Sequence, residues 1–112
     1  MTRSFKQELT AVFGHPVAEN PTQVMAEAAY RALGLDWRYL TIEVLPADLA
    51  TAVRGAVAMG FRGFNCTIPH KVAVVSLLDE LTPAARAIGA VNCVAIRNGH
   101  PLGENTDGKG FL

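Results

Sequence analysis

The chain has 112 residues, of which half are hydrophobic and 18% are charged. This length suits one domain with a single core, and this composition excludes a disordered chain. Ten basic and ten acidic residues cancel, so nothing indicates nucleic-acid binding, and no apolar run is long enough to span a membrane. We predict one domain, residues 1–112, and because the first residues lack an apolar leader, a cytoplasmic location.

Strands and helices alternate along the sequence. Strands are predicted at residues 9–13, 37–45, 61–67, 91–97 and 101–103, and helices at 21–33, 46–59, 69–81 and 82–88. Asn98-Gly99 is typical of the two-residue turn of a hairpin. Three strand–helix–strand repeats followed by a hairpin predict an α/β fold: a mostly parallel sheet with helices on both faces and one antiparallel hairpin strand.

Polar residues follow several of the predicted strands. Ligands of open α/β sheets bind at the carboxyl ends of strands. Three groups of polar residues are expected there: residues 14–22, the pair Asn65 and Thr67 with Lys71, and Asn92 with residues 105–107. Each residue taken alone has an ordinary explanation as a loop or capping residue. Their collection at one edge of one sheet favours a binding site.

Lys71 is the least expected of these residues. It follows Pro69 in the first turn of a predicted helix, where the helix dipole disfavours a cation. A solvated lysine there would cost only a few tenths of a kcal/mol, so a surface role stays open. A helix N-terminus also lowers the pKa of a nearby amine, which suits a lysine that transfers protons. Asp107 is a possible partner in that transfer, or a helix cap before Gly108.

The two cysteines do not predict a metal site. Cys66, His70 and Cys93 would need a fourth ligand to hold zinc. In a strand, Cys66 also points away from the face that carries Asn65 and Thr67. We therefore predict two small buried hydrophobic side chains.

Residues 103–109 match the spacing of a phosphate-binding loop, but not its chemistry. Gly110 stands where that motif needs a hydroxyl for magnesium. Glu104 and Asp107 would also place two negative charges against the phosphates. We reject this interpretation.

Three ordered segments resemble signature blocks of the shikimate dehydrogenase family, and a fourth resembles its opening motif more loosely. The three are GFRGFNCTIPHK (60–71), AIGAVNCV (87–94) and GENTDGKGF (103–111), and the fourth is FGHPVAENPTQVMAEAAYRALGL (13–35). Together they span nearly the whole chain without insertions. The resemblance implies a substrate-binding domain, followed after residue 112 by a Rossmann domain that binds NADP. The chain has no glycine-rich cofactor loop of its own.

The resemblance also implies a reaction and its residues. The family interconverts 3-dehydroshikimate and shikimate with NADP, in aromatic amino-acid biosynthesis. Lys71 matches the catalytic lysine, which exchanges a proton with the substrate hydroxyl. Asp107 matches the catalytic aspartate that holds this lysine and a ring hydroxyl. Thr67 and Asn92 match positions that bind the substrate.

The segment before the first helix departs from the family pattern. Where the family usually has S-x-S-P to bind the substrate carboxylate, this chain has Asn20-Pro21-Thr22-Gln23. Asn20 and Thr22 are predicted to contact the substrate, although Asn20 also suits a helix cap. Glu19 replaces a common histidine and adds a carboxylate near a site for an anion. The resemblance makes shikimate the first expected substrate. The departures in this segment leave quinate, an amino analogue or another cyclic polyol acid as alternatives. A binding module without catalysis is the alternative from another functional class.

Overall fold

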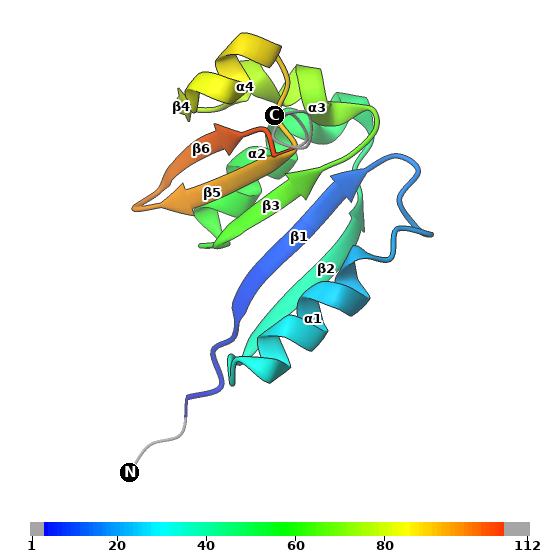
Figure 1. Ribbon diagram of the computed structural model, residues 1–112, viewed down its shortest axis with the longest axis vertical. Coiled ribbons are helices and arrows are strands. Elements are labelled where there is room, and N and C mark those ends of the chain that lie inside the picture. The colour runs from blue at the N-terminus through cyan, green and yellow to red at the C-terminus, as the bar shows by residue number, and fades with distance from the viewer. Residues whose placement is uncertain (1–3, 107–112) are drawn as a thin grey trace.

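The computed structural model describes residues 4–106, in which six strands form one sheet with helices on both faces (Figure 1). The strands are β1 (Glu8–Gly14), β2 (Trp37–Glu43), β3 (Gly63–Cys66), β4 (Glu80–Leu81), β5 (Cys93–Arg97) and β6 (His100–Glu104). The α-helices are α1 (Thr22–Ala32), α2 (Leu49–Ala58), α3 (His70–Ala73) and α4 (Pro83–Ile88). Two short 3-10 helices are η1 (Pro46–Asp48) and η2 (Val74–Leu77).

The strand order is β2-β1-β3-β5-β6-β4. β1 pairs in parallel with β2 and β3, and β4 pairs in parallel with β6, whereas β5 is antiparallel to both β3 and β6. Within the described residues, β5 therefore runs opposite to the other strands. Asn98 and Gly99 join β5 to β6 with φ angles of 53° and 78°, as a tight hairpin turn requires. The predicted sheet with one antiparallel hairpin strand is confirmed.

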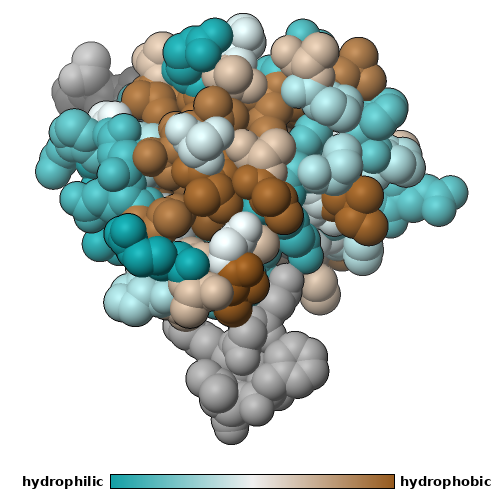
Figure 2. Space-filling model, turned by 90° about the horizontal axis from the view of Figure 1, so that it is seen from above, coloured by the Kyte–Doolittle hydropathy of each residue, from teal (hydrophilic) through white to brown (hydrophobic). Residues whose placement is uncertain are grey.

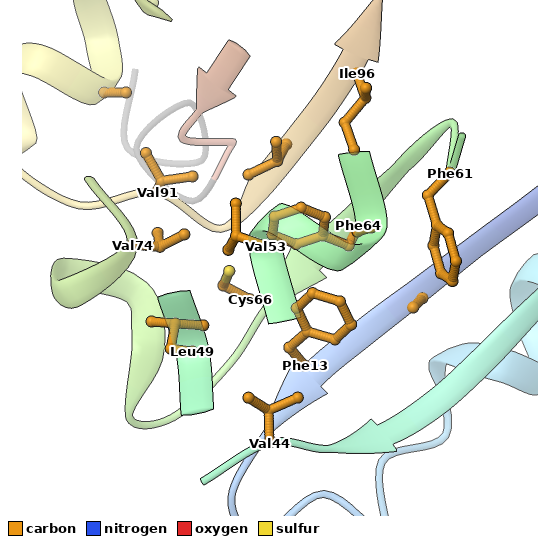
Figure 3. Packing of buried hydrophobic residues seen from close by; sticks show 14 residues of the cluster. Phe13, Val44, Leu49, Val53, Phe61, Phe64, Cys66, Val74, Val91 and Ile96 are labelled. Carbon is orange, nitrogen blue, oxygen red and sulfur yellow. The ribbon is translucent and has the colours of Figure 1, made fainter. Parts of the chain in front are cut away.

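Each face of the sheet buries its own set of side chains. In β1, Val12 packs with Val17 and Tyr39 on the face covered by α1. Its neighbour Phe13 points to the opposite face, because successive residues of a strand alternate. There the ring of Phe13 stacks on that of Phe64, with centroids 4.6 Å apart. This second face, which α2 covers, holds the larger core (Figure 3).

Local sequence signals set several element ends as predicted. α4 begins at Pro83, and the hydroxyl of Thr82 accepts a hydrogen bond from the backbone N–H of Ala85 (3.3 Å). Gly34 and Gly60 follow α1 and α2 with positive φ angles, which glycine adopts without strain. Within residues 4–106, no helix has both the length and the apolar character needed to cross a membrane.

The predicted helix at residues 69–81 is wrong in its second half. α3 covers only four residues, η2 follows, and the chain is extended at Leu78. The next residues pair with the edge of β6, where Asp79 N–H bonds to the Pro101 carbonyl (3.0 Å) and Thr82 N–H to that of Gly103 (2.9 Å). Backbone pairing with the free edge of β6 thus stabilises residues 80 and 81 as strand β4, and this pairing overrides the local propensity of the segment for a helix.

Candidate functional site

The loop that carries Thr67 and Lys71 is held by backbone hydrogen bonds to neighbouring segments. Thr67 N–H bonds to the carbonyl of Phe13 in β1 (3.0 Å), and the carbonyl of Ile68 accepts from His15 N–H (2.9 Å). The carbonyl of Lys71 accepts from Val91 N–H, just before β5 (2.8 Å). Because α3 is too short to be rigid by itself, these tertiary bonds place Lys71 at the carboxyl ends of β1 and β3.

His70 anchors the start of α3 in the core. Its side chain is 1% exposed, and its Nε2 lies 2.6 Å from the carbonyl oxygen of Val44. Since a carbonyl only accepts, Nε2 carries the proton, and Nδ1 has no hydrogen-bond partner within residues 4–106. From the sequence, His70 was a candidate only for the rejected zinc site. The structure instead makes it a buried contact beside Lys71.

Asn65 and Asn92 lie side by side at the same edge. The Nδ2 of Asn65 donates to the carbonyl of Asn92 (3.3 Å), and the hydroxyl of Tyr39 donates to Asn65 Oδ1 (2.7 Å). Burial raises the pKa of Tyr39, so its hydroxyl stays a donor at neutral pH. Tyr39 was not among the predicted site residues. The alternation of residues in its strand predicts which face of the sheet Tyr39 lies on, but it does not predict that Tyr39 bonds to Asn65.

Asn92 holds the chain that leads out of β6. Its Nδ2 donates to the hydroxyl of Thr106 (2.8 Å), and its Oδ1 accepts from the backbone N–H of Thr106 (3.0 Å). The next residue along the chain, Asp107, lies outside the described residues. Asn92 therefore fixes the last described residue before the predicted catalytic aspartate.

A pocket of about 520 Å³ adjoins Thr67 on the loop that follows β1. Its lining residues are Pro16, Val17, Ala18, Glu19, Asn20 and Thr67. Gly14 makes room for this arrangement, because a Cβ at that position would overlap the methyl group of Thr67. Thr22 is not among the lining residues, and neither are Lys71 and Asn92. Of the predicted site residues that the structure describes, Asn20 and Thr67 line this pocket.

Asn20 acts as a cap and also reaches the pocket. Its Oδ1 accepts from the backbone N–H of Thr22 (2.9 Å), which satisfies one free donor at the start of α1. Its amide nitrogen has no hydrogen-bond partner within the described part of the chain. The side chain thus has a structural role and an unused donor at the pocket wall.

Glu27 joins α1 to β2. One of its carboxylate oxygens accepts from Arg38 Nε (2.8 Å) and from the backbone N–H of Tyr39 (2.9 Å). These bonds lower the pKa of Glu27, with the hydrogen bond from Arg38 as the larger cause. Glu27 is therefore a structural contact, placed outside the pocket beside Thr67.

The cysteines are separate from this chemistry. Cys66 is 3% exposed in the large core (Figure 3), and burial raises the pKa of its thiol to about 12. Cys93 is half-buried, and burial followed by the nearby Glu104 carboxylate raises its pKa. Cys66 thus points away from the face of Asn65, as predicted. Residues 4–106 contain no group of three His, Cys, Asp or Glu side chains arranged to hold a metal ion.

A second pocket, of about 380 Å³, lies on the sheet face beside α1. Aromatic residues Tyr30, Trp37 and Tyr39 line it together with Arg62, whose guanidinium lies 5.1 Å from the centre of the Trp37 ring. Asn65 also lines this pocket, whereas Thr67, Lys71 and Asn92 do not. It is therefore distinct from the pocket beside Thr67.

The end of the molecule that carries α3 and α4 exposes hydrophobic side chains. Figure 2 looks down on this end and shows them gathered over a broad area. Ile68, Val72 and Ile88, which belong to the loop after β3, to α3 and to α4, are 70%, 69% and 50% exposed. The surface around Lys71 therefore combines a polar site with an apolar border.

The structure places several of the predicted residues near one edge of the sheet. Thr67, Lys71 and Asn92 lie on neighbouring backbone segments at the ends of β1 and β3, and Asn20 and Thr67 line the same pocket. Thr22 contributes a backbone donor to Asn20. Ammonium, amide and hydroxyl groups in such an arrangement can bind the oxygen atoms of a small polyhydroxylated molecule and pass a proton to one of them.

The chain is similar to known proteins over most of its length. Residues 12–94 match the family model described as the shikimate dehydrogenase substrate binding domain. An NADP(+)-dependent shikimate dehydrogenase of Geobacter metallireducens is 48% identical over 107 residues, which cover 96% of this chain and 37% of that enzyme. This chain therefore spans less than two fifths of the length of that relative.

Solved structures share the fold closely. The 5-ketofructose reductase of Gluconobacter sp. strain CHM43, in its ligand-free form, has a TM-score of 0.94 and 56% identity, covering 97% of this chain and 39% of that one. A shikimate 5-dehydrogenase of Listeria monocytogenes, in complex with shikimate and NAD, has a TM-score of 0.92 and 36% identity, covering 99% and 39%. With a family model matched over most of its length, the chain belongs to the family of shikimate dehydrogenase substrate-binding domains.

Proposed function

We propose that the chain is the substrate-binding domain of an NADP-linked dehydrogenase that interconverts a ketone and a secondary alcohol. The first candidate reaction is the reversible reduction of 3-dehydroshikimate to shikimate. The observation that carries the proposal is the placement of Thr67, Lys71 and Asn92 on neighbouring backbone segments at one edge of the sheet, in a chain of this family.

In this proposal, Lys71 exchanges a proton with the reacting oxygen. During reduction its ammonium gives a proton to the carbonyl oxygen, and during oxidation its amine takes that proton back. Asp107 would hold Lys71 and a substrate hydroxyl in place. Asn20, Thr22, Thr67 and Asn92 are the proposed substrate-binding residues, and Thr67 and Asn20 lie at the pocket itself. A bound nicotinamide supplies the hydride that the carbonyl carbon receives.

The cofactor is proposed to bind to a region outside the part matched here. Relatives of this chain are more than twice its length, and the chain has no glycine-rich loop of the dinucleotide-binding type. We place this region over the end of the molecule that carries α3 and α4. The exposed Ile68, Val72 and Ile88, in the loop after β3, in α3 and in α4, support this placement, because a second domain would remove their apolar surface from water. Residues 1–112 would then be one substrate-binding domain.

A second candidate substrate is 5-ketofructose. The reductase of Gluconobacter that is named for this sugar is 56% identical to the chain. 5-Ketofructose carries hydroxyl and carbonyl groups but no carboxylate. This chemistry suits a pocket whose wall includes the carboxylate of Glu19.

Turnover tests both candidates. The chain is joined to the remaining part of the Geobacter metallireducens enzyme, and NADPH consumption is measured with 3-dehydroshikimate and with 5-ketofructose. Lys71→Ala is expected to lower the rate on the active substrate by about 100-fold or more, because it removes the proton donor. Lys6→Ala, which removes a lysine paired with Glu8 at the surface, is the control and should change the rate by less than about twofold. A Lys71→Ala variant with more than a tenth of the original rate would assign the lysine to the solvated surface instead.

A further inference from the structure

We propose that the pocket beside Thr67 selects an uncharged, hydroxyl-rich substrate over one that carries a carboxylate, and that Glu19 sets this preference. The inference rests on the proposed function, since it concerns the substrate of that site. It names the chemical class of the substrate from the groups that line the pocket.

The charge of the pocket wall is the first argument. Among its lining residues, Glu19 has the one charged side chain, and this side chain is exposed. Within residues 4–106, no cation pairs with the Glu19 carboxylate. A carboxylate bound in the same pocket would meet a like charge, which weakens binding by about fivefold even when the two charges are in water about 4 Å apart.

The N-terminus of α1 does not offset this repulsion. The first N–H groups of a helix usually attract anions. Here Pro21 has no N–H, the N–H of Thr22 bonds to Asn20 Oδ1 (2.9 Å), and the N–H of Val24 bonds to the carbonyl of Pro21 (3.0 Å). Most of the donors that an anion would need are therefore absent or already used.

The groups that remain available suit hydroxyls. The hydroxyl of Thr67 and the amide nitrogen of Asn20 have no hydrogen-bond partner within the described part of the chain. The Glu19 carboxylate accepts hydrogen bonds only, and its two oxygens can accept from two neighbouring hydroxyls. Donors and an ionised acceptor in one pocket match a polyol, because each hydroxyl both donates and accepts.

Two ligands of nearly the same shape test the inference. Shikimate carries a carboxylate at neutral pH, and its methyl ester does not. Dissociation constants of both are measured with the 112-residue chain by NMR titration, at low and at high salt. The ester is expected to bind about five times more tightly or better, with a smaller difference at high salt.

Glu19→Gln is the decisive variant. It keeps the size of the side chain and removes its charge, so the preference for the ester should shrink to less than about twofold. Glu80→Gln is the matched control, because it removes the same charge from β4, at the far edge of the sheet. It should leave the preference unchanged.

Three results would overturn the inference. If shikimate binds as tightly as its ester or more tightly, the charge preference is wrong while the proposed function stands. If Glu19→Gln and Glu80→Gln change the ratio equally, the preference does not come from Glu19. If neither ligand gives saturable shifts around Thr67, shikimate is ruled out as the substrate in the proposed function, and the inference fails with it.

Discussion

The hydrogen bond between Tyr39 and Asn65 links the core to the candidate site. Tyr39 is 3% exposed, and its hydroxyl donates to an amide whose other end donates to the carbonyl of Asn92. The amide of Asn65 is half-buried, and without this donor its oxygen would lose a hydrogen bond that it makes in the folded chain. At this scale, therefore, a residue outside the site fixes the orientation of a residue within it.

Tyr39→Phe is expected to lower the free energy of unfolding by about 1 kcal/mol, because it removes the hydroxyl and leaves Asn65 Oδ1 without this donor. Urea denaturation of Tyr39→Phe, Asn65→Ala and the double variant measures the effect. The two substitutions should show a coupling energy of about 1 kcal/mol. If the two effects add to within about 0.3 kcal/mol, the bond contributes nothing to stability.

At the scale of elements, two glycines that each follow an arginine differ in whether the structure has room for a side chain at their position. Gly63 in β3 lies against β5, where a Cβ would overlap the carbonyl oxygen of Val94. Gly55 lies in α2, where a Cβ would make ordinary contact with Met59 at 3.8 Å. β3 thus needs a glycine for strand pairing, whereas α2 tolerates one at a cost in chain entropy.

Opposite effects on stability are therefore expected from the same substitution. Gly55→Ala should raise the free energy of unfolding by about 0.5–1 kcal/mol, because alanine favours the helix. Gly63→Ala should lower it by about 1–3 kcal/mol, because β3 and β5 must move apart. Thermal and urea unfolding of both variants provide the measurement. A Gly63→Ala variant as stable as the unchanged chain would show that this pairing is not tight.

For the whole molecule, burial of Cys66 makes stability depend on pH. Burial raises the pKa of the thiol to about 12 from 9.0, with Cys93 adding to the rise and Lys71 opposing it. The unfolded thiol loses its proton from about pH 9 upward, while the folded one keeps it to about pH 12. The stabilisation is therefore complete below pH 9 and is lost as pH rises from 9 to 12.

The free energy of unfolding is expected to fall by up to about 1.4 kcal/mol for each pH unit in this range as a result of Cys66. Cys66→Val removes this thiol and should flatten the dependence, whatever its effect at neutral pH. Urea unfolding at several values between pH 8 and 11 compares the two chains. Cys93 and Tyr39, whose pKa values are also raised, leave a smaller slope in the variant. Equal slopes would contradict the assignment.

The sequence determined the fold class and most of the elements, because their signals are local. Alternating apolar residues marked the strands, Thr82 with Pro83 marked a helix start, and Asn98-Gly99 marked the hairpin turn. The helix dipole expected at Lys71 required a longer helix than α3, which has only four residues. The resemblance of its segment to a known family indicated the candidate site, which stays a prediction. These features depend on neighbours in the chain, so the sequence alone is enough to find them.

Only the tertiary structure decided how distant segments meet. Residues 80 and 81 join the sheet because the edge of β6 lies beside them, which no local pattern predicts. His70 can lie in the core because the carbonyl of Val44 accepts a hydrogen bond from its Nε2–H. The side-chain oxygen of Asn20 caps the start of α1, and the same residue lines a pocket together with Glu19. Hydrogen bonds and charges act between residues that are distant in the sequence. The set of polar and charged groups that line this pocket therefore depends on tertiary packing, which local sequence patterns do not predict.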